Sequence, residues 1–258
     1  MNFTINKRYF YEKLSVVSRA ISVFSPLPAF SGVKIDVSAT QIVLTGSDSD
    51  ISIRSTILPD EDNQLTINDI GSIVIEAKYI LEIVRKIEGD VIEIEILDDT
   101  LTRISGTNAQ FKINGMKSTD YPAIDFSQPR ESFQISSEVL KEIITQTCFA
   151  TSDRETRPVL TGVNFSCQDQ QLQCVATDSY RLAKKLVPID ATVSFNITIP
   201  SKSLQEVLKS IGEEENVTLY VDHKKAQFLI DHTIIQTRLI DGAYPETSRL
   251  IPADFSYE

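Results

Sequence analysis

The chain carries the same sequence pattern twice. Three segments recur 130 residues further on: Phe3–Ile5 as Phe133–Ile135, Pro28–Val33 as Pro158–Val163, and Ser47–Ser49 as Thr177–Ser179. After a small deletion in the second copy the offset falls to 124, where Ile75–Lys78 matches Ile199–Lys202, and Tyr121-Pro122 matches Tyr244-Pro245 at 123. Because the matches keep their order with only small gaps, the sequence predicts two homologous domains in tandem.

Each copy predicts the same kinds of element. A strand at Phe3–Ile5 precedes an amphipathic helix near residues 8–21, and a second helix is expected near residues 77–88, both with apolar side chains at helical spacing. Segments such as Val91–Ile96 alternate apolar and polar residues, as half-buried strands do. We therefore expect an α+β fold in which each domain has antiparallel sheets outside and two helices inside. The expected domains are residues 1–125 and 130–247, joined by Tyr121–Glu131, with residues 248–258 beginning a further linker.

Composition excludes several classes of function. With 258 residues and 41% hydrophobic side chains, the chain can bury a sizeable core, and its net charge of −11 argues against a generally basic nucleic-acid coat. It has two histidines, and it has no glycine-rich phosphate loop, so we expect no catalytic site. The aspartates of 48–50 and 60–62 are interpreted as solvated turn carboxylates rather than metal ligands. The sequence predicts no metal and no cofactor.

The expected location is the cytoplasm. Cys148, Cys167 and Cys174 are odd in number and lack CxxC spacing, which favours free thiols in a reducing compartment. No apolar run approaches the roughly 20 residues of a membrane helix, and the first residues contain no apolar signal segment. We therefore predict no membrane association.

The outward faces of the predicted helices repeat a basic-acidic-basic pattern. The second helix carries Lys78, Glu82 and Arg85 opposite its apolar stripe, and its counterpart carries Lys202, Glu206 and Lys209. On the first helix this face has Arg8, Glu12 and Arg19. Such a face is typical of solvated ion pairs along a helix. The alternative is a phosphate-facing surface, which binds any nucleic-acid sequence and weakens with salt.

Three segments resemble the bacterial DNA polymerase III beta subunit, the beta sliding clamp, of the Gram-positive type: Thr156–Val163, Ala176–Ala183 and Asp241–Pro252. The resemblance implies an accessory subunit rather than an enzyme, part of a homo-oligomeric ring that encircles double-stranded DNA. In the family, three domains per subunit and head-to-tail dimers place helices around the hole and sheets outside. The DNA-binding residues implied here are Lys78, Arg85, Lys202, Lys209, Arg8 and Arg19. Their contact with DNA is expected to be loose and blind to base sequence.

The resemblance also implies a pocket for client proteins. The replicative polymerase, the clamp loader and repair proteins are expected to bind it through short linear motifs with glutamine and large apolar side chains. The matching positions are Leu160, Thr177, Ser179, Tyr180, Arg181, Leu182, Pro245, Arg249 and Leu250. From the residues alone, without the resemblance, an ordinary core is the favoured interpretation of Leu160 and Leu182.

Two features depart from the family pattern. The loop of residues 22–26 lacks the arginine that some relatives use for DNA contact, and the sequence stops where a third copy of the repeat is expected to begin. Three hypotheses stay open: a clamp chain represented by two of three domains, a complete two-domain subunit that closes as a trimer, as in eukaryotic and archaeal clamps, or a client-binding scaffold or decoy without DNA encirclement. Native mass and retention on circular DNA distinguish them.

Overall fold

Each repeat folds into the same succession of strands and helices. The computed structural model describes residues 1–22, 25, 27–212 and 216–247. The first repeat contains β1 (Asn2–Asn6), α1 (Lys7–Ser18), β2 (Gly32–Val37), β3 (Ile42–Ser47), β4 (Ile51–Ile57), β5 (Thr66–Asp69), β6 (Gly71–Glu76), α2 (Ala77–Lys86), β7 (Val91–Asp98), β8 (Leu101–Ser105) and β9 (Gln110–Asn114). The second contains β10 (Glu131–Ser136), α3 (Ser137–Thr147), β11 (Gly162–Gln168), β12 (Gln171–Thr177), β13 (Leu182–Pro188), β14 (Phe195–Pro200), α4 (Ser201–Ser210), β15 (Asn216–Val221), β16 (Lys225–Ile230) and β17 (Thr233–Arg238).

The first helix of each repeat begins at an equivalent capping residue. The Asn6 side chain accepts a hydrogen bond from the Tyr9 amide at 3.0 Å, and the Ser136 hydroxyl accepts one from the Val139 amide at 3.2 Å. These caps satisfy amide groups that have no partner within the helix. α1 ends at Ser18, before the predicted residue 21, because the amides of the next three residues bond to the carbonyl three positions back instead of four. α2 ends at Lys86 because the backbone of Ile87 is extended.

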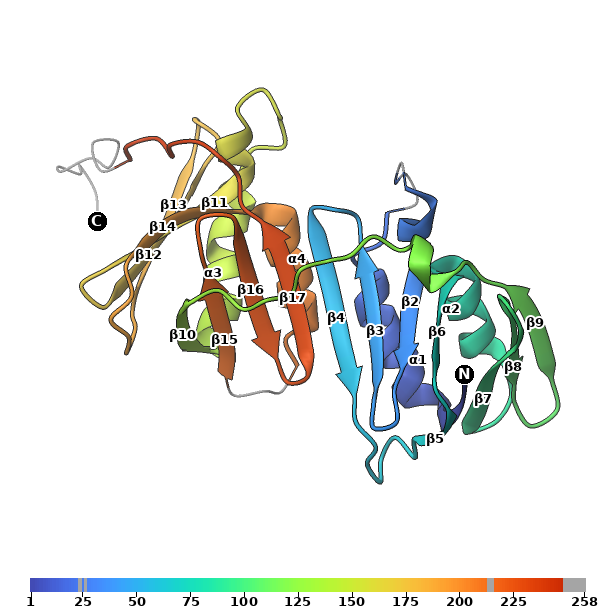
Figure 1. Cartoon of the computed structure of the whole chain (residues 1–258). Helices are drawn as coiled ribbons and strands as arrows, with labels where there is room; N and C mark the ends of the chain where they lie inside the picture. Colours follow the sequence, from blue (N-terminus) through green and yellow to red (C-terminus); the bar gives the residue numbers. More distant parts are fainter. Residues whose placement is uncertain (23–24, 26, 213–215, 248–258) are drawn as a thin grey trace.

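A single sheet runs through both repeats. Its eight strands follow the order β10-β15-β16-β17-β4-β3-β2-β6, and the antiparallel pairing of β17 with β4 joins the two halves. A five-stranded sheet of order β5-β1-β7-β8-β9 completes the first repeat, and a four-stranded sheet of order β13-β12-β11-β14 completes the second. All four α-helices lie on one face of the eight-stranded sheet (Figure 1). The expected α+β fold with two helices in each domain is confirmed.

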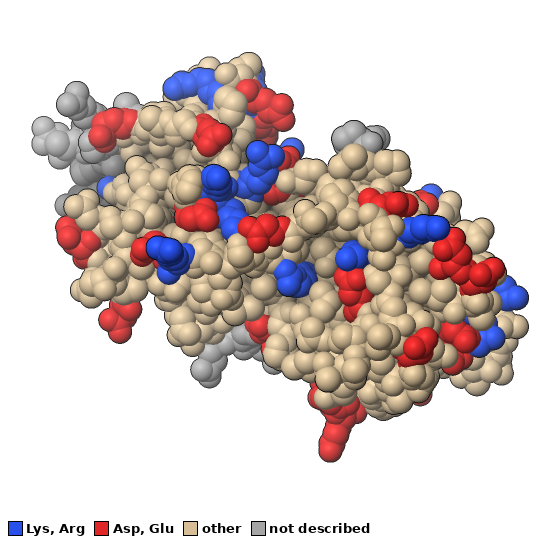
Figure 2. Space-filling model, in the orientation of Figure 1, with Lys and Arg blue, Asp and Glu red and all other residues tan. Residues whose placement is uncertain are grey.

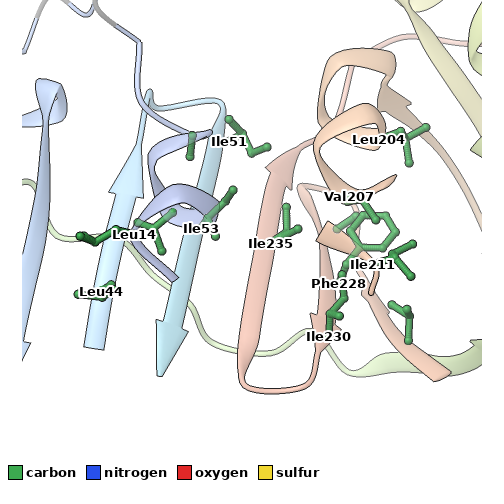
Figure 3. Packing of buried hydrophobic residues seen from close by; sticks show 14 of the residues in the cluster. Leu14, Leu44, Ile51, Ile53, Leu204, Val207, Ile211, Phe228, Ile230 and Ile235 are labelled. Atoms are coloured by element: carbon green, nitrogen blue, oxygen red, sulfur yellow. The ribbon is translucent and has the colours of Figure 1, made fainter. Parts of the chain in front are cut away.

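The hydrophobic core is also continuous across the junction. Ile51 and Ile53 on β4 and Ile235 on β17 are buried on the face that carries the helices. Figure 3 shows Ile53 toward α1 and Ile235 toward Val207 on α4. These residues belong to one cluster that includes core residues of both repeats. The β17–β4 pairing therefore merges the cores of the two repeats.

The linker between the repeats is held against the outer side of this junction. The Arg54 guanidinium lies 3.9 Å from the ring centre of the buried Phe126, a cation–π contact, and burial lowers the pKa of Arg54. The Lys225 ammonium donates to the carbonyl of Asp125 at 3.0 Å, and the Gln227 amide group donates to the carbonyl of Ser127 at 3.1 Å. The linker thus reinforces the relative orientation of the two repeats.

The repeats differ in one element. The first connects β4 to β6 through residues 58–70, which include β5, whereas the second connects β13 to β14 through residues 189–194 alone. β5 pairs with the outer edge of β1, and the described part of the chain has no strand in the corresponding place beside β10. The small deletion inferred from the sequence offsets therefore removes a strand.

Candidate functional site

The predicted phosphate-facing residues lie on exposed helical surfaces. Lys78 and Lys202 occupy the second position of α2 and α4, respectively, and both side chains are exposed. No ion pair involves either ammonium group among the residues that the structure describes. The two helices that carry these lysines, α2 and α4, lie on the same face of the eight-stranded sheet (Figure 1). Figure 2 shows the opposite face of the sheet, where basic and acidic groups are interspersed.

The other basic residues of these two helices are ion-paired in the same way. Arg85 lies 2.7 Å from the Glu82 carboxylate, and Lys209 lies 2.8 Å from Glu206, each pair three residues apart. Lys86 also contacts Glu82 at 2.8 Å. Hydrogen bonds from Lys86 and Arg85 lower the pKa of Glu82. The carboxylates of Glu82 and Glu206 therefore reduce the positive charge that Arg85 and Lys209 offer to an anion. Lys78 and Lys202 are thus the stronger candidates for contact with phosphates.

The two arginines predicted on α1 have different surroundings. Arg8 is highly exposed and pairs with Glu12 at 3.1 Å, four residues away on the same helix. The Arg19 guanidinium reaches the second repeat, where it donates to the Lys209 carbonyl at 2.9 Å and to the Ser210 hydroxyl at 3.1 Å. A cation at the last carbonyls of α4 also interacts favourably with the helix dipole. Arg19 thus stabilises the junction.

The predicted client pocket is centred on the turn between β12 and β13. The Asp178 carboxylate accepts hydrogen bonds from the amides of Tyr180 and Arg181 at 2.9 and 3.0 Å, and these bonds lower the pKa of Asp178. The Thr177 hydroxyl donates to the Arg181 carbonyl at 2.7 Å, and Ser179 adopts a φ of 79°. These bonds fix the backbone from which the exposed side chains of the turn project.

The first repeat has the same turn at the 130-residue offset. Asp48 accepts from the amides of Asp50 and Ile51 at 3.0 and 2.9 Å, and Ser49 has a φ of 85°. That turn contacts the second repeat at the junction, because the Asp50 carbonyl accepts a hydrogen bond from the Arg238 amide at 2.9 Å. In the second repeat the position of Asp50 is taken by Tyr180, whose side chain is 94% exposed. The two turns therefore share their backbone structure, and they differ in that one contacts the other repeat whereas the second presents a large exposed aromatic side chain.

The pocket residues differ in exposure. Leu160 is buried, at 3% exposure, so it supports the turn from beneath, whereas Leu182 and Pro245 are half-buried and Arg181 is exposed. The Arg181 guanidinium lies 5.7 Å from the ring centre of Phe149, an aromatic residue that is 57% exposed. Arg249 and Leu250 lie outside the described residues. Around the turn, Leu182 and Pro245 are partly exposed apolar groups, and Tyr180 and Arg181 expose a phenol and a guanidinium.

Two residues that contact the turn were missed from the predicted pocket. The Tyr244 hydroxyl accepts a hydrogen bond from the Thr177 amide at 3.0 Å, which ties the segment after β17 to the turn. The Arg157 guanidinium donates to the Ser179 hydroxyl at 3.4 Å. The Tyr-Pro repeat was a usable signal for Tyr244. However, its counterpart Tyr121 is buried against Phe30, with ring centres 5.2 Å apart, so the repeat alone does not specify the role.

The aspartates at the turns bond to nearby backbone groups, and the cysteines are packed inside the protein. Asp48 caps its own turn, and Asp60 accepts a hydrogen bond from the Asn63 amide at 2.6 Å. Among the described residues, no cluster of His, Cys, Asp and Glu side chains is suited to a metal ion, and no helix has the length and apolar character to cross a membrane. The three cysteines, Cys148, Cys167 and Cys174, are free and buried, and burial raises the pKa of each thiol.

Comparisons with known proteins identify the family. The profile of the DNA polymerase III beta subunit N-terminal domain matches residues 1–125, and the profile of its central domain matches residues 134–246. The beta sliding clamp of Bacillus subtilis is 39% identical over 263 residues, covering 100% of this chain and 70% of that protein. The chain belongs to the bacterial beta sliding clamp family. The clamp of Halalkalibacterium halodurans is 40% identical, covering 98% of this chain and 69% of the relative.

Solved clamp structures show the same arrangement of both repeats. The crystal structure of the Bacillus subtilis clamp has a TM-score of 0.95 at 38% identity, over 98% of this chain and 68% of that one. The beta chain from Streptococcus pneumoniae has a TM-score of 0.95 at 34% identity, with the same coverage of both chains. The predicted family, a DNA replication and processivity factor, is therefore confirmed. The match extends over two domains of a longer clamp.

Proposed function

We propose that this chain supplies the DNA-facing arc of a ring that encircles duplex DNA and tethers the replicative polymerase. The helices would form the inner surface of the ring, and the exposed ammonium groups of Lys78 and Lys202 would contact phosphates. Family membership supports this role. The observation that carries it for this chain is the repetition of one unpaired cation, at the same helical position, on one side of a continuous sheet.

The proposed contact is weak and independent of base sequence. Lys78 and Lys202 stand on separate helices, and phosphate contacts carry no sequence information directly. The neighbouring Glu82 and Glu206 engage the remaining cations of α2 and α4. A surface of this kind attracts DNA without fixing it at one site, which suits a protein that slides.

The salt dependence of DNA affinity tests the proposal. The variant Lys78→Gln/Lys202→Gln removes two charges, and the slope of log affinity against log salt should become shallower by about 1.8, since each phosphate contact contributes about 0.9. The matched control is Lys112→Gln/Lys184→Gln, which removes two exposed lysines from β9 and β13. Equal slopes for the two double variants would contradict the placement of DNA on the helices.

The second part of the proposal concerns client proteins. We infer that the surface around the Thr177–Leu182 turn binds short linear motifs of the polymerase, the clamp loader and repair proteins. Leu182 and Pro245 would contact the large apolar side chains of the motif, while the turn and Tyr244 fix their positions. Apolar clefts with a few oriented polar groups are typical of peptide recognition.

A peptide titration tests this pocket. For a peptide with glutamine and large apolar residues, Leu182→Ala should weaken binding about tenfold, because the half-buried leucine loses about 1–2 kcal/mol of apolar contact. The matched control is Leu186→Ala on the same strand, whose side chain is 48% exposed. Equal losses for both variants would place the peptide elsewhere.

Retention on DNA separates the clamp from a client-binding scaffold or decoy. A closed assembly stays on circular DNA in high salt and leaves when the circle is cut, whereas a scaffold binds client peptides without such topological retention. Native mass then gives the number of subunits. Nucleotide incorporation by the purified chain would contradict the proposal that it is an accessory subunit without polymerase activity.

A further inference from the structure

Among the residues that the structure describes, no strand covers the outer edge of β10, whereas β5 covers the corresponding edge of β1 in the first repeat. There, β5 pairs with β1 in an antiparallel register that places Ile67 opposite Phe3 and Asp69 opposite Asn2. In the second repeat β10 ends the eight-stranded sheet, and the connection of residues 189–194 forms no strand. An edge strand presents unpaired amide and carbonyl groups that favour pairing with another strand.

A groove of about 570 Å³ lies at the start of β10, where Glu131 is the one residue of this strand in its lining. Its lining comes from the end of the linker, the start of β14 and the turn after β15, and comprises Gln128–Glu131, Ser194–Ile197 and Val221–His223. Phe195 stacks against Phe133 with ring centres 5.7 Å apart and planes 16° apart. Since Phe133 matches Phe3, the groove borders the place that corresponds to the β5 side of β1.

The groove also carries a cation, one residue away from the position that is cationic in the first repeat. In the first repeat, the Asp69 carboxylate lies 3.1 Å from the amino terminus of Met1. In the second repeat the acidic Glu131 occupies the position of Met1, and the cation in the groove lining is the exposed Arg130 that precedes it. The nearby Asp222 carboxylate accepts hydrogen bonds from the amides of Lys224 and Lys225 at 2.7 and 2.8 Å. This carboxylate is therefore already bonded to the backbone of its own turn. Arg130 is therefore positioned for an acidic group of an incoming strand.

We propose that this groove binds an extended, unstructured segment of another protein, which adds as an antiparallel strand to the free edge of β10. The segment carries an apolar β-branched residue opposite Phe133 and an acidic residue two positions further on, beside Arg130. Ile67 and Asp69 show this pattern in the first repeat. Backbone hydrogen bonds supply the affinity of such a complex, while the apolar and acidic side chains supply its specificity.

The chain's own β5 sequence provides a probe. A fluorescent peptide with the sequence of residues 64–71 should bind the whole chain, as measured by fluorescence anisotropy, and it should slow hydrogen exchange of the β10 amides. Arg130→Glu should weaken binding about threefold or more, and a peptide with lysine in place of Asp69 should regain the loss. The matched control is Arg154→Glu, at an exposed arginine outside the groove lining, which should leave binding unchanged.

Four results would overturn the proposal. The first is no anisotropy change with millimolar protein, and the second is equal binding by Arg130→Glu and the wild type. The third is slowed exchange confined to β1, which would mean that the peptide replaces β5 in the first repeat. The fourth is a doubled mass without peptide that Arg130→Glu reverses, which would assign the groove to a second copy of the chain instead of a partner segment.

Discussion

The junction between the repeats allows a quantitative test of the continuous core. Ile53 on β4 and Ile235 on β17 stand directly opposite each other, and both side chains are fully buried. Truncation of either residue to alanine should cost about 2–5 kcal/mol of unfolding free energy, since it removes buried methyl groups and leaves a cavity. Because opposite side chains in a sheet lie in contact, each truncation also removes contacts of the other residue.

The expected result is a non-additive pair. In Ile53→Ala/Ile235→Ala the contacts between the two side chains are lost only once, although each single variant loses them. The double variant should therefore be more stable, by about 1 kcal/mol, than the sum of the two single effects predicts. Guanidinium denaturation followed by far-UV circular dichroism measures the four proteins of this cycle. Ile53→Ala/Ile143→Ala is the control, because Ile143 is fully buried on α3, which packs against strands other than β4.

Additivity of the junction pair to within about 0.3 kcal/mol would refute the reasoning. It would mean that β17 and β4 pair through their backbones without a tightly packed core between these side chains. A coupling of the expected size supports a fixed angle between the repeats. The proposed ring requires such an angle, because a flexible junction would lose the curvature of the ring.

Three further predictions concern the pocket and the thiols. Tyr244→Phe removes the hydrogen-bond acceptor of the Thr177 amide, and it should weaken client-peptide binding up to about fivefold, for a cost of up to 1 kcal/mol, with the fold unchanged by circular dichroism. The lowered pKa of Asp178 stabilises its turn above the ordinary carboxyl pKa of about 3.9, so hydrogen-exchange protection of the turn should be constant from pH 7 to about 5 and be lost as the pH falls through the lower, folded-state value. A thiol reagent at pH 8 should modify the native chain slowly and the unfolded chain fully, because burial raises the pKa values of Cys148, Cys167 and Cys174.

Features that depend on nearby residues were predictable from the sequence. The apolar spacing of Phe10, Leu14 and Val17 gives the buried stripe of α1, and the exposed positions of Lys78 and Lys202 follow from the same periodicity. The repeat offsets gave two domains of one fold, and the change of offset located a deletion. Each of these inferences uses interactions within a few residues, or compares the chain with itself.

Features that depend on distant residues became known only from the tertiary structure. Strand edges expose the same backbone groups whatever their sequence, so nothing local indicates that β17 pairs with β4 or that Arg19 caps α4. The shape of both repeats decides which edges meet, and it therefore decides that β4 is covered while the edge of β10 is open. The sequence determined the two repeats and the buried and exposed faces of their helices. The packing of one repeat on the other decided the continuous core, the relative orientation of the repeats and which strand edges are covered.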